Sequence, residues 1–353
     1  MLLAAAVSVG ACGGSGGPVT GPSSAAPTST STSAPVASTT TSTLPTDSHG
    51  AAAAGLRSPL PVPEALAPFV GTSTVSGQGI WSPVGRTVGD IPAVYETALV
   101  PPGGNLPVGV AWMDMHRLSA LLYSGSRSPG NGPFHYSAPI QPAQAATLVA
   151  AFNGGFLMAN AQGGYYTDGR VVDPLVDGAA SMVFYASGDI DIGAWGTDVS
   201  MGPDVVGVRQ NLVPLVAAGA PTAAATSSDW QAWGATCGAA SCAHTVPGIE
   251  AQWRSGVGVT ASGALVYVSG PALSPEQLAE VLVRAGAQRG MELDINPDWT
   301  VLVTYDPATP DGLATPTNGT KLVSNSVQGP WTFFESQWAR DFVTLSARSA
   351  RSA

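Results

Sequence analysis

Two short segments of the chain carry residue types that could do chemistry. In the first, Asn153-Gly154-Gly155-Phe156, an amide side chain stands beside backbone without Cβ atoms, which lets a polar ligand approach closely. The second is the strand-like run 292–298. Strand alternation puts Glu292, Asp294 and Asn296 on one face of that run and aliphatic residues on the other. Three polar groups on one face indicate a binding or catalytic site rather than a solvated surface.

Asp294 is the first candidate for a catalytic carboxylate, and Glu292 is the candidate for its partner. Glycoside hydrolysis commonly combines a carboxyl group of raised pKa with an ionised carboxylate. Two strand residues on one face lie about 7 Å apart, so the pair fits either a retaining or an inverting enzyme. Asp294 could instead only bond nearby backbone amides. Asn296 and Asp298 are candidates for binding substrate, although Asp298 could simply begin a turn.

Three further positions are candidates for holding the substrate. Arg254 offers a planar guanidinium that matches two phosphate oxygens; the alternative is an ion pair with a carboxylate such as Glu250. Asn153, with the two glycine amides after it, is expected to contact a sugar hydroxyl or a phosphate oxygen, unless the glycines serve turn geometry only. Asp168, in an Asp-Gly pair, is either part of the site or a plain β-turn.

Composition limits the class of partner. Of 353 residues, only 10% are charged, against roughly 25% in an average soluble protein, and the net charge is −10. An acidic surface argues against nucleic acid, which requires basic patches. We expect a monomer that acts on a carbohydrate or sugar-phosphate substrate and requires no cofactor. Carboxylates near a phosphate could nevertheless share a divalent cation such as calcium.

The N-terminal part predicts export and anchoring. Residues 1–11 are small and apolar and are followed by Cys12, the spacing of a bacterial lipoprotein signal over residues 1–12. No Lys or Arg precedes Arg57, so we expect the true start to lie upstream. Residues 13–56, rich in Ser, Thr, Pro and Gly, predict a disordered tether. The sequence thus predicts an extracytoplasmic lipoprotein, held at the membrane through lipid on Cys12.

Two further cysteines lie close together, at Cys237 and Cys242. In an oxidising compartment a local disulfide between them is the expected state. A metal pair with the neighbouring His244 is the alternative, although the ligand spacing does not suit zinc.

The folded part is expected to be one α+β domain over residues 57–348, with mixed twisted β-sheets, hairpins and a few packed helices. Short β-rich runs predict strands over residues 95–100, 108–112 and 119–123, and a helix is predicted over 142–150. Two hairpins are predicted with the same Ala-Ser-Gly turn, one over residues 181–195 and one over 257–268.

The clearest predicted element is a helix that follows Leu273. Ser274 and Gln277 form a capping box around Pro275, and apolar residues recur at helical spacing up to Ala285. The chain then enters a predicted strand over residues 291–296. A strand, a packed helix and a second strand form a crossover unit, in which ligands gather at the carboxyl ends of strands.

These residues, taken in order, resemble the phosphodiester glycosidase domain family. The resemblance rests on the Asn153 segment, Asp168-Gly169, the hairpin 181–195, the run Arg254 to Thr260, and the helix and strand that end at Asp294. Arg340-Asp341-Phe342 resembles the closing segment of that family. The match is strongest over residues 145–345. The family is typified by an enzyme that removes N-acetylglucosamine from a phosphodiester.

The resemblance implies an exported glycosidase that hydrolyses the bond between a sugar and a phosphodiester in an envelope or extracellular glycan. One departure bears on that activity. Where the family has a glycine turn and a serine after its Asp, this chain has Ile295-Asn296-Pro297-Asp298. Proline cannot adopt the positive φ that such a turn requires. The alternative is therefore a non-catalytic glycan-binding surface module on the same fold.

Overall fold

The computed structural model describes residues 55–227, 233, 252–309 and 311–349, all of which belong to one unit of the chain, Asp47–Ala353. The predicted lipidation site Cys12, the predicted disulfide between Cys237 and Cys242, and nearly all of the predicted tether lie outside these residues. The predicted bounds of the signal segment (1–12), the tether (13–56) and the folded domain (57–348) therefore stay predictions. Among the described residues, no helix is long and apolar enough to cross a bilayer.

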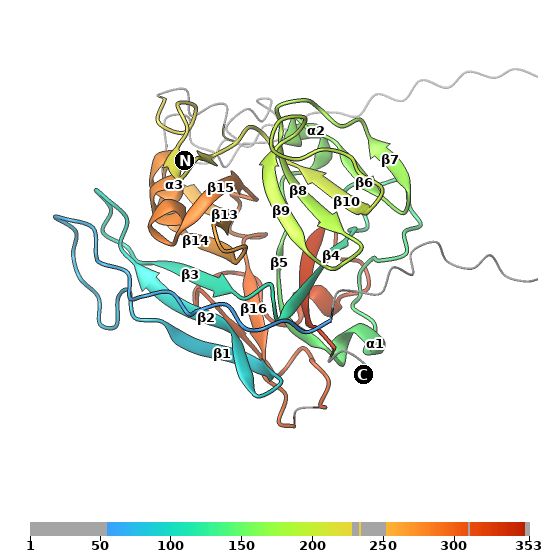
Figure 1. Cartoon of the computed structure of the whole chain (residues 1–353), viewed down its shortest axis with the longest axis horizontal. Helices are drawn as coiled ribbons and strands as arrows, with labels where there is room; N and C mark the ends of the chain where they lie inside the picture. Colours follow the sequence, from blue (N-terminus) through green and yellow to red (C-terminus); the bar gives the residue numbers. More distant parts are fainter. Residues whose placement is uncertain (1–54, 228–232, 234–251, 310, 350–353) are drawn as a thin grey trace, which may run out of the picture. The chain divides into compact units, whose positions relative to one another are not determined.

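The fold is mostly β, and the predicted α+β class is wrong. Strands account for 39% of the residues and helices for 8%. The described strands form three sheets of eight, five and five strands, and their neighbouring strands are antiparallel rather than mixed. Figure 1 shows the three sheets together with the few short helices.

The eight-stranded sheet carries the second half of the candidate site. Its strands follow the order β1-β2-β3-β14-β13-β15-β11-β12. Their bounds are Ser82–Val88 (β1), Ile91–Leu99 (β2), Val108–Met113 (β3), Val216–Ala217 (β11), Ala220–Pro221 (β12), Gln252–Thr260 (β13), Leu265–Leu273 (β14) and Ala287–Glu292 (β15). The predicted hairpin over residues 257–268 is confirmed as part of the longer β13–β14 pair.

A five-stranded sheet, called here the β10 sheet, contains the other predicted hairpin. Its order is β7-β6-β10-β8-β9. The strands span Tyr165–Thr167 (β6), Arg170–Asp173 (β7), Ala180–Tyr185 (β8), Ile190–Ala194 (β9) and Val205–Gln210 (β10). β8 and β9 pair in register from Ala180 with Ala194 to Phe184 with Ile190, which confirms the hairpin predicted over residues 181–195.

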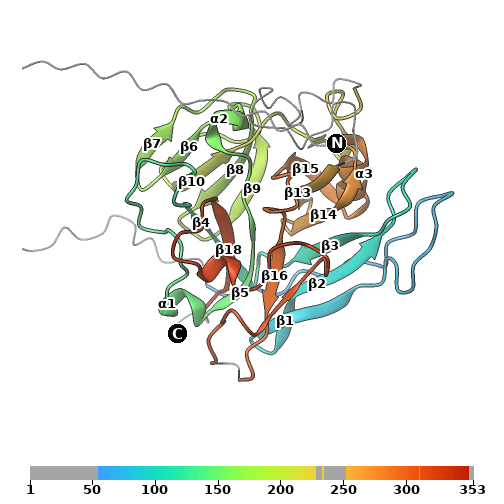
Figure 2. The ribbon, with the colours of Figure 1, turned by 180° about the vertical axis from the view of Figure 1, so that it is seen from behind.

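The third sheet, called the β5 sheet, carries the Asn153 segment at the end of β5. Its order is β17-β16-β5-β18-β4. The strands span Leu118–Tyr123 (β4), Leu148–Asn153 (β5), Leu302–Tyr305 (β16), Gly319–Lys321 (β17) and Phe342–Ala347 (β18). Figure 2 shows β5, β16 and β18 from behind.

The helix predicted over residues 142–150 is wrong in its second half. Helix α1 spans only Pro142–Ala145, and β5 begins at Leu148. All six residues of β5 are buried, and the strand pairs with β16 on one side and β18 on the other. A short, continuously apolar run has the same appearance in a buried helix and in a central strand. Helix α2 (Met158–Ala161) and the 3₁₀ helix η2 (Thr332–Phe334) are also single turns.

Helix α3, Pro275–Arg284, is confirmed with its predicted cap. The Ser274 hydroxyl accepts the backbone N–H of Gln277, and the Gln277 side chain returns to the Ser274 N–H. The apolar stripe of α3 packs on β13, β14 and β15. β14 and β15 both pair antiparallel with β13 between them, so β14, α3 and β15 form the expected parallel crossover.

The largest core cluster joins all three sheets. It includes Met113 of the eight-stranded sheet and Leu293, which directly follows β15. It also includes Phe184 of the β10 sheet and Phe152 and Val343 of the β5 sheet. Burying large apolar side chains from all sides holds the sheet ends at fixed positions. The carboxyl ends of β5 and β15 meet next to this core, and the polar site residues lie there.

Candidate active site

Asn153, the last residue of β5, joins three parts of the fold through its side chain. Its Oδ1 accepts the Val301 backbone N–H (3.0 Å) and the Tyr267 hydroxyl (2.7 Å). Its Nδ2 donates to the Gly154 carbonyl (2.9 Å) and to Ser255 Oγ (3.0 Å). The side chain is buried and these four bonds occupy it. The structure thus gives Asn153 a structural role, and its predicted contact with substrate stays a prediction.

The two glycines after Asn153 make room for the protein's own polar groups. A Cβ on Gly154 would lie 2.0 Å from Asp341 Oδ2, and one on Gly155 would lie 2.6 Å from Asn211 Oδ1. Both distances are far below van der Waals contact. The close approach predicted for a ligand is therefore made by Asp341 and Asn211.

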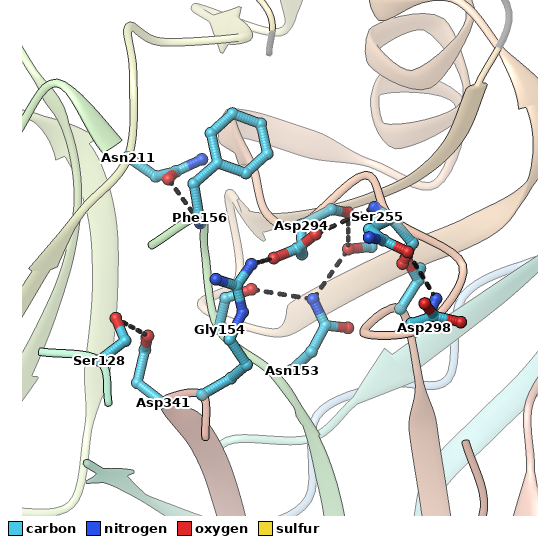
Figure 3. Close-up of polar contacts among 12 residues, drawn as sticks. Ser128, Asn153, Gly154, Phe156, Asn211, Ser255, Asp294, Asp298 and Asp341 are labelled. Atoms are coloured by element: carbon cyan, nitrogen blue, oxygen red, sulfur yellow. Dashed lines mark hydrogen bonds and ion pairs between the residues drawn. The ribbon is translucent and has the colours of Figure 1, made fainter. Parts of the chain in front are cut away.

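Asp294 lies just beyond the end of β15 and pairs with Arg340. The Arg340 guanidinium donates to Asp294 Oδ2, and the side chains are 9% and 3% exposed. Asp294 is tied to the Asn153 corner by backbone bonds: its N–H donates to the Gly154 carbonyl, and its own carbonyl accepts Ser255 Oγ at 2.8 Å. Figure 3 shows Asp294, Gly154, Asn153 and Ser255 joined in this network.

Arg340 extends this site toward an aromatic pair. Its guanidinium carbon lies 5.1 Å from the centre of the Trp299 ring, which meets Trp338 edge to face. Burial lowers the pKa of Arg340 to about 10, so the side chain remains charged at neutral pH. Its Nε is buried and donates to none of the described residues. We call Arg340–Asp294 the outer pair.

Glu292 and Arg254 form a second pair, called the inner pair. Arg254 Nη1 donates to Glu292 Oε1 at 2.5 Å, and the side chains are 2% and 0% exposed. Arg254 also donates to the Leu273 carbonyl (2.8 Å) and the Trp233 carbonyl (3.0 Å). The alternative reading of Arg254, an ion pair with a carboxylate, is what the structure shows, with Glu292 as partner. Its predicted role in binding phosphate stays a prediction.

The protonation of Glu292 is governed by burial. Removal from water raises its pKa to about 7, although Arg254 acts in the opposite direction. Its second oxygen, Oε2, is buried and accepts no hydrogen bond from the described residues. A carboxyl group with such a pKa exchanges a proton near neutrality, as a general acid or base requires.

Asp341 and Arg209 form a third buried pair that the sequence did not single out as a site. Arg209 Nε donates to Asp341 Oδ2 at 2.8 Å, and both side chains are fully buried. The Asp341 carbonyl accepts the Gly154 N–H at 2.9 Å, which joins this pair to the Asn153 corner. Ser128 Oγ lies 3.4 Å from Asp341 Oδ1, as Figure 3 shows. In the sequence, Asp341 stands out only as part of Arg340-Asp341-Phe342, one of the segments on which the resemblance to phosphodiester glycosidases rests, and Arg209 does not stand out.

The segment Ile295-Asn296-Pro297-Asp298 is built from two side-chain caps. Asp294 Oδ1 accepts the Asn296 N–H (2.9 Å), and Asn296 Oδ1 accepts the Asp298 N–H (2.8 Å). Asx turns of this kind bend the chain without a positive φ. Asn296, Pro297 and Asp298 are exposed, and the Asp298 carboxylate bonds to none of the described residues. Asn296 and Asp298 therefore lie on the surface beside the outer pair.

Asp168 lies in the tight turn between β6 and β7. Asp168 and Gly169 have φ values of +52° and +69°, as a two-residue hairpin turn requires. The Asp168 carboxylate accepts the His135 backbone N–H at 2.8 Å. This geometry agrees with the alternative that Asp168 only forms a β-turn. Its predicted role in binding substrate stays a prediction.

The sequence-predicted residues are therefore brought together in part. Asn153, Gly154 and Gly155 meet Asp294 at one polar corner, with Asn296 and Asp298 at its surface. Arg254 and Glu292 form a closed pair beside it. In the part of the chain that the structure describes, no group of three or more His, Cys, Asp or Glu side chains could hold a metal ion.

Comparison with known proteins gives distant structural likenesses only. No family model and no curated protein matches the sequence. The zebrafish N-acetylglucosamine-1-phosphodiester alpha-N-acetylglucosaminidase catalytic domain, auto-inhibited by its pro-peptide, is 13% identical with a TM-score of 0.42; the match covers 76% of this chain and 87% of that one. A hypothetical protein from Synechocystis is 12% identical with a TM-score of 0.42, covering 76% of this chain and 64% of that one. Neither likeness assigns a reaction to this chain.

Proposed function

We propose that this protein is a hydrolase that cleaves the bond between a sugar and a phosphodiester. The observation that carries the proposal is a pair of neighbouring carboxylates in unlike surroundings. Burial raises the pKa of Glu292 to about 7, whereas Asp294 is held against the Arg340 guanidinium. Carboxyl groups whose environments separate their proton affinities are the usual arrangement of glycoside hydrolysis.

Asp294 is assigned to the anomeric centre, and Arg340, rather than Arg254, is assigned to bind the phosphate. In the proposed reaction a water oxygen bonds to the anomeric carbon while that carbon's bond to the phosphate oxygen breaks. One water proton stays on the sugar hydroxyl, the other passes to a carboxylate, and the phosphate leaves as a monoester. Glu292 is assigned the second carboxylate role because its pKa is raised and because its Oε2 accepts no hydrogen bond from the part of the chain that the structure describes.

The test is hydrolysis of a panel of methyl phosphodiesters of N-acetylglucosamine, mannose and galactose, each with α and β linkage at the anomeric carbon. Release of methyl phosphate is followed by ³¹P NMR. We expect at least one diester to be cleaved and Asp294→Asn to lower the rate by about 10²–10⁴-fold. Glu292→Gln is expected to lower it and to remove the ionisation near pH 7 from the pH–rate profile.

Asp191→Asn is the matched control for these variants. Asp191 also pairs with an arginine, Arg289, at 2.7 Å, but its side chain is 29% exposed and it lies on β9. The control should retain the wild-type rate, and each variant should keep the wild-type circular dichroism. Equal rates for wild type and Asp294→Asn would contradict the assignment.

A second candidate function is a glycan-binding module without turnover. It is favoured by the internal hydrogen bonds that occupy the Asn153 side chain and by the closed inner pair. Binding of glycans without cleavage of any diester in the panel would establish this function instead.

Export and anchoring through Cys12 belong to the same proposal and concern a part of the chain outside the described residues. Incorporation of labelled palmitate by the wild type and not by Cys12→Ser would support the anchor. A labelled Cys12→Ser protein would contradict it.

A further inference from the structure

One large aromatic side chain, Trp331, is exposed to solvent in the loop that follows Gln328. Trp331 is 46% exposed, whereas the other described tryptophans are buried or half-buried. Tryptophan carries a large apolar surface that folding normally covers. An exposed Trp therefore offers a contact surface for a ligand.

The Trp331 ring is held in place by its own loop. A Cβ on Gly329 would lie 2.1 Å from the six-membered part of the indole, so the ring rests directly on the Gly329 backbone. Thr332 N–H donates to the Gly329 carbonyl and closes the turn that presents the ring. An aromatic ring with one face supported by backbone is ordered before a ligand arrives, which reduces the entropy lost on binding.

The same loop is bonded to the turn that follows Asp294. Gln328 Nε2 donates to the Asp298 carbonyl at 2.8 Å, and Gln328 Oε1 accepts Thr332 Oγ1 at 3.1 Å. Asp298 is in turn bonded through Asn296 to Asp294. The Trp331 loop is thus tied to the outer pair through one continuous set of hydrogen bonds.

Polar groups for a bound molecule lie on this connecting turn. The exposed Asp298 carboxylate accepts no hydrogen bond from the described residues, and the Asn296 amide nitrogen donates to none of them. An exposed aromatic ring, on a loop that is hydrogen-bonded to a turn with unused polar groups, matches a sugar, whose C–H face is apolar and whose rim carries hydroxyls. A lipid alcohol would use the ring but leave the polar groups without partners.

We propose that Trp331, with Asn296 and Asp298, binds a second sugar ring, so that the preferred substrate is a phosphodiester of a glycan of two or more sugars. This inference rests on the proposed function for the identity of the cleaved bond. The sugar contact itself stands on the exposed ring, its glycine support and the adjoining polar groups.

The first experiment measures binding without turnover. The full chain carrying Asp294→Asn is applied to an array of defined neutral oligosaccharides of one to six sugars, and affinities are measured by calorimetry for the best-bound member. We expect binding of an oligosaccharide of two or more sugars in preference to its monosaccharide. Trp331→Leu should weaken that binding by about tenfold or more, as removal of a central aromatic contact does.

Three further variants separate stacking from general apolar contact. Trp331→Phe keeps a flat ring and should bind within a few-fold of the parent, while Gly329→Ala should weaken binding because the added methyl displaces the indole. Val171→Ala, at another exposed apolar position, on β7, should change nothing. Equal binding by Trp331→Leu and its parent, or no binding to any array member, would overturn the proposal.

Turnover distinguishes this inference from the function on which it rests. If oligosaccharides bind through Trp331 while no diester is cleaved, the hydrolase proposal fails and the sugar contact stands. If diesters are cleaved equally well by wild type and Trp331→Leu whatever the glycan length, the hydrolase proposal stands and the sugar contact fails.

Discussion

The carboxylates of the inner and outer ion pairs, Glu292 and Asp294, lie two residues apart in the sequence, but the surroundings of the two pairs differ. The inner pair, Arg254–Glu292, is at most 2% exposed and its arginine is also bonded to backbone carbonyls. The outer pair, Arg340–Asp294, adjoins Trp299 and a turn whose residues are exposed. The comparison shows that the end of one strand can supply both a fully buried pair and a pair next to an exposed turn.

The largest expected effect comes from opening the inner pair. Arg254→Met leaves the Glu292 carboxyl buried without its cation, and we expect a loss of about 3–5 kcal/mol of unfolding free energy at pH 8. At pH 5 Glu292 is protonated and needs no cation, so the loss should be smaller. Urea unfolding at both pH values measures this difference. Equal losses at pH 5 and pH 8 would contradict a protonatable inner pair.

The next effect is the pH dependence of the wild-type stability. The pKa of Glu292 is raised from 4.5 to about 7, so the folded state binds more protons than the unfolded state between these values. Stability from this group is therefore complete below about pH 4.5 and falls by about 3 kcal/mol as the pH rises to 7. In Glu292→Gln this slope should be absent.

Burial also raises the pKa of Glu96, on β2, to about 7, so this group contributes a slope of the same sign. Glu96→Gln serves as the comparison, because it should remove only its own share. Thermal unfolding between pH 4.5 and 7.5 provides the measurement, and an unchanged slope in both variants would refute the account.

A smaller effect tests the corner that joins the pairs. Gly154→Ala places a methyl group 2.0 Å from Asp341 Oδ2, and we expect a loss of about 1–3 kcal/mol from the forced shift. Gly207→Ala, on β10, is the matched control, since its added methyl would meet neighbours at 3.4 Å or more. Denaturant unfolding of the two variants should separate them; equal stability would show that the corner tolerates rearrangement.

The smallest expected change in stability is at the outer pair. Lysine in Arg340→Lys keeps the charge but not the planar contact with Trp299 and Asp294. We expect a loss of about 1 kcal/mol in stability together with a much larger loss of diester hydrolysis. Calorimetry and the ³¹P assay check the two parts, and full activity in Arg340→Lys would remove the arginine from the proposed site.

Features that depend on neighbouring residues could be predicted from the sequence, whereas contacts between residues far apart in the chain could not. The capping box of α3 and the hairpin turns depend on neighbouring residues, and they are confirmed. The partners of Asp294 and Asp341 lie 46 and 132 positions away in the chain, so no spacing could reveal them.

The fold class failed for a similar reason. The run Leu148–Asn153 is a strand because β16 and β18 lie on both sides of it, which the run itself does not encode. The strand alternation predicted over residues 292–296 is also wrong at the site. It placed Glu292, Asp294 and Asn296 on one face, but β15 ends at Glu292, so the next residues turn toward Arg340 and solvent.

The most direct test of the central claim is the fate of oxygen from ¹⁸O-labelled water during hydrolysis of a sugar 1-phosphodiester. Attack of water on the anomeric carbon beside Asp294 predicts that the label enters the released sugar and is absent from the phosphate monoester. Label in the phosphate, or no turnover of any diester in the panel, would contradict the account.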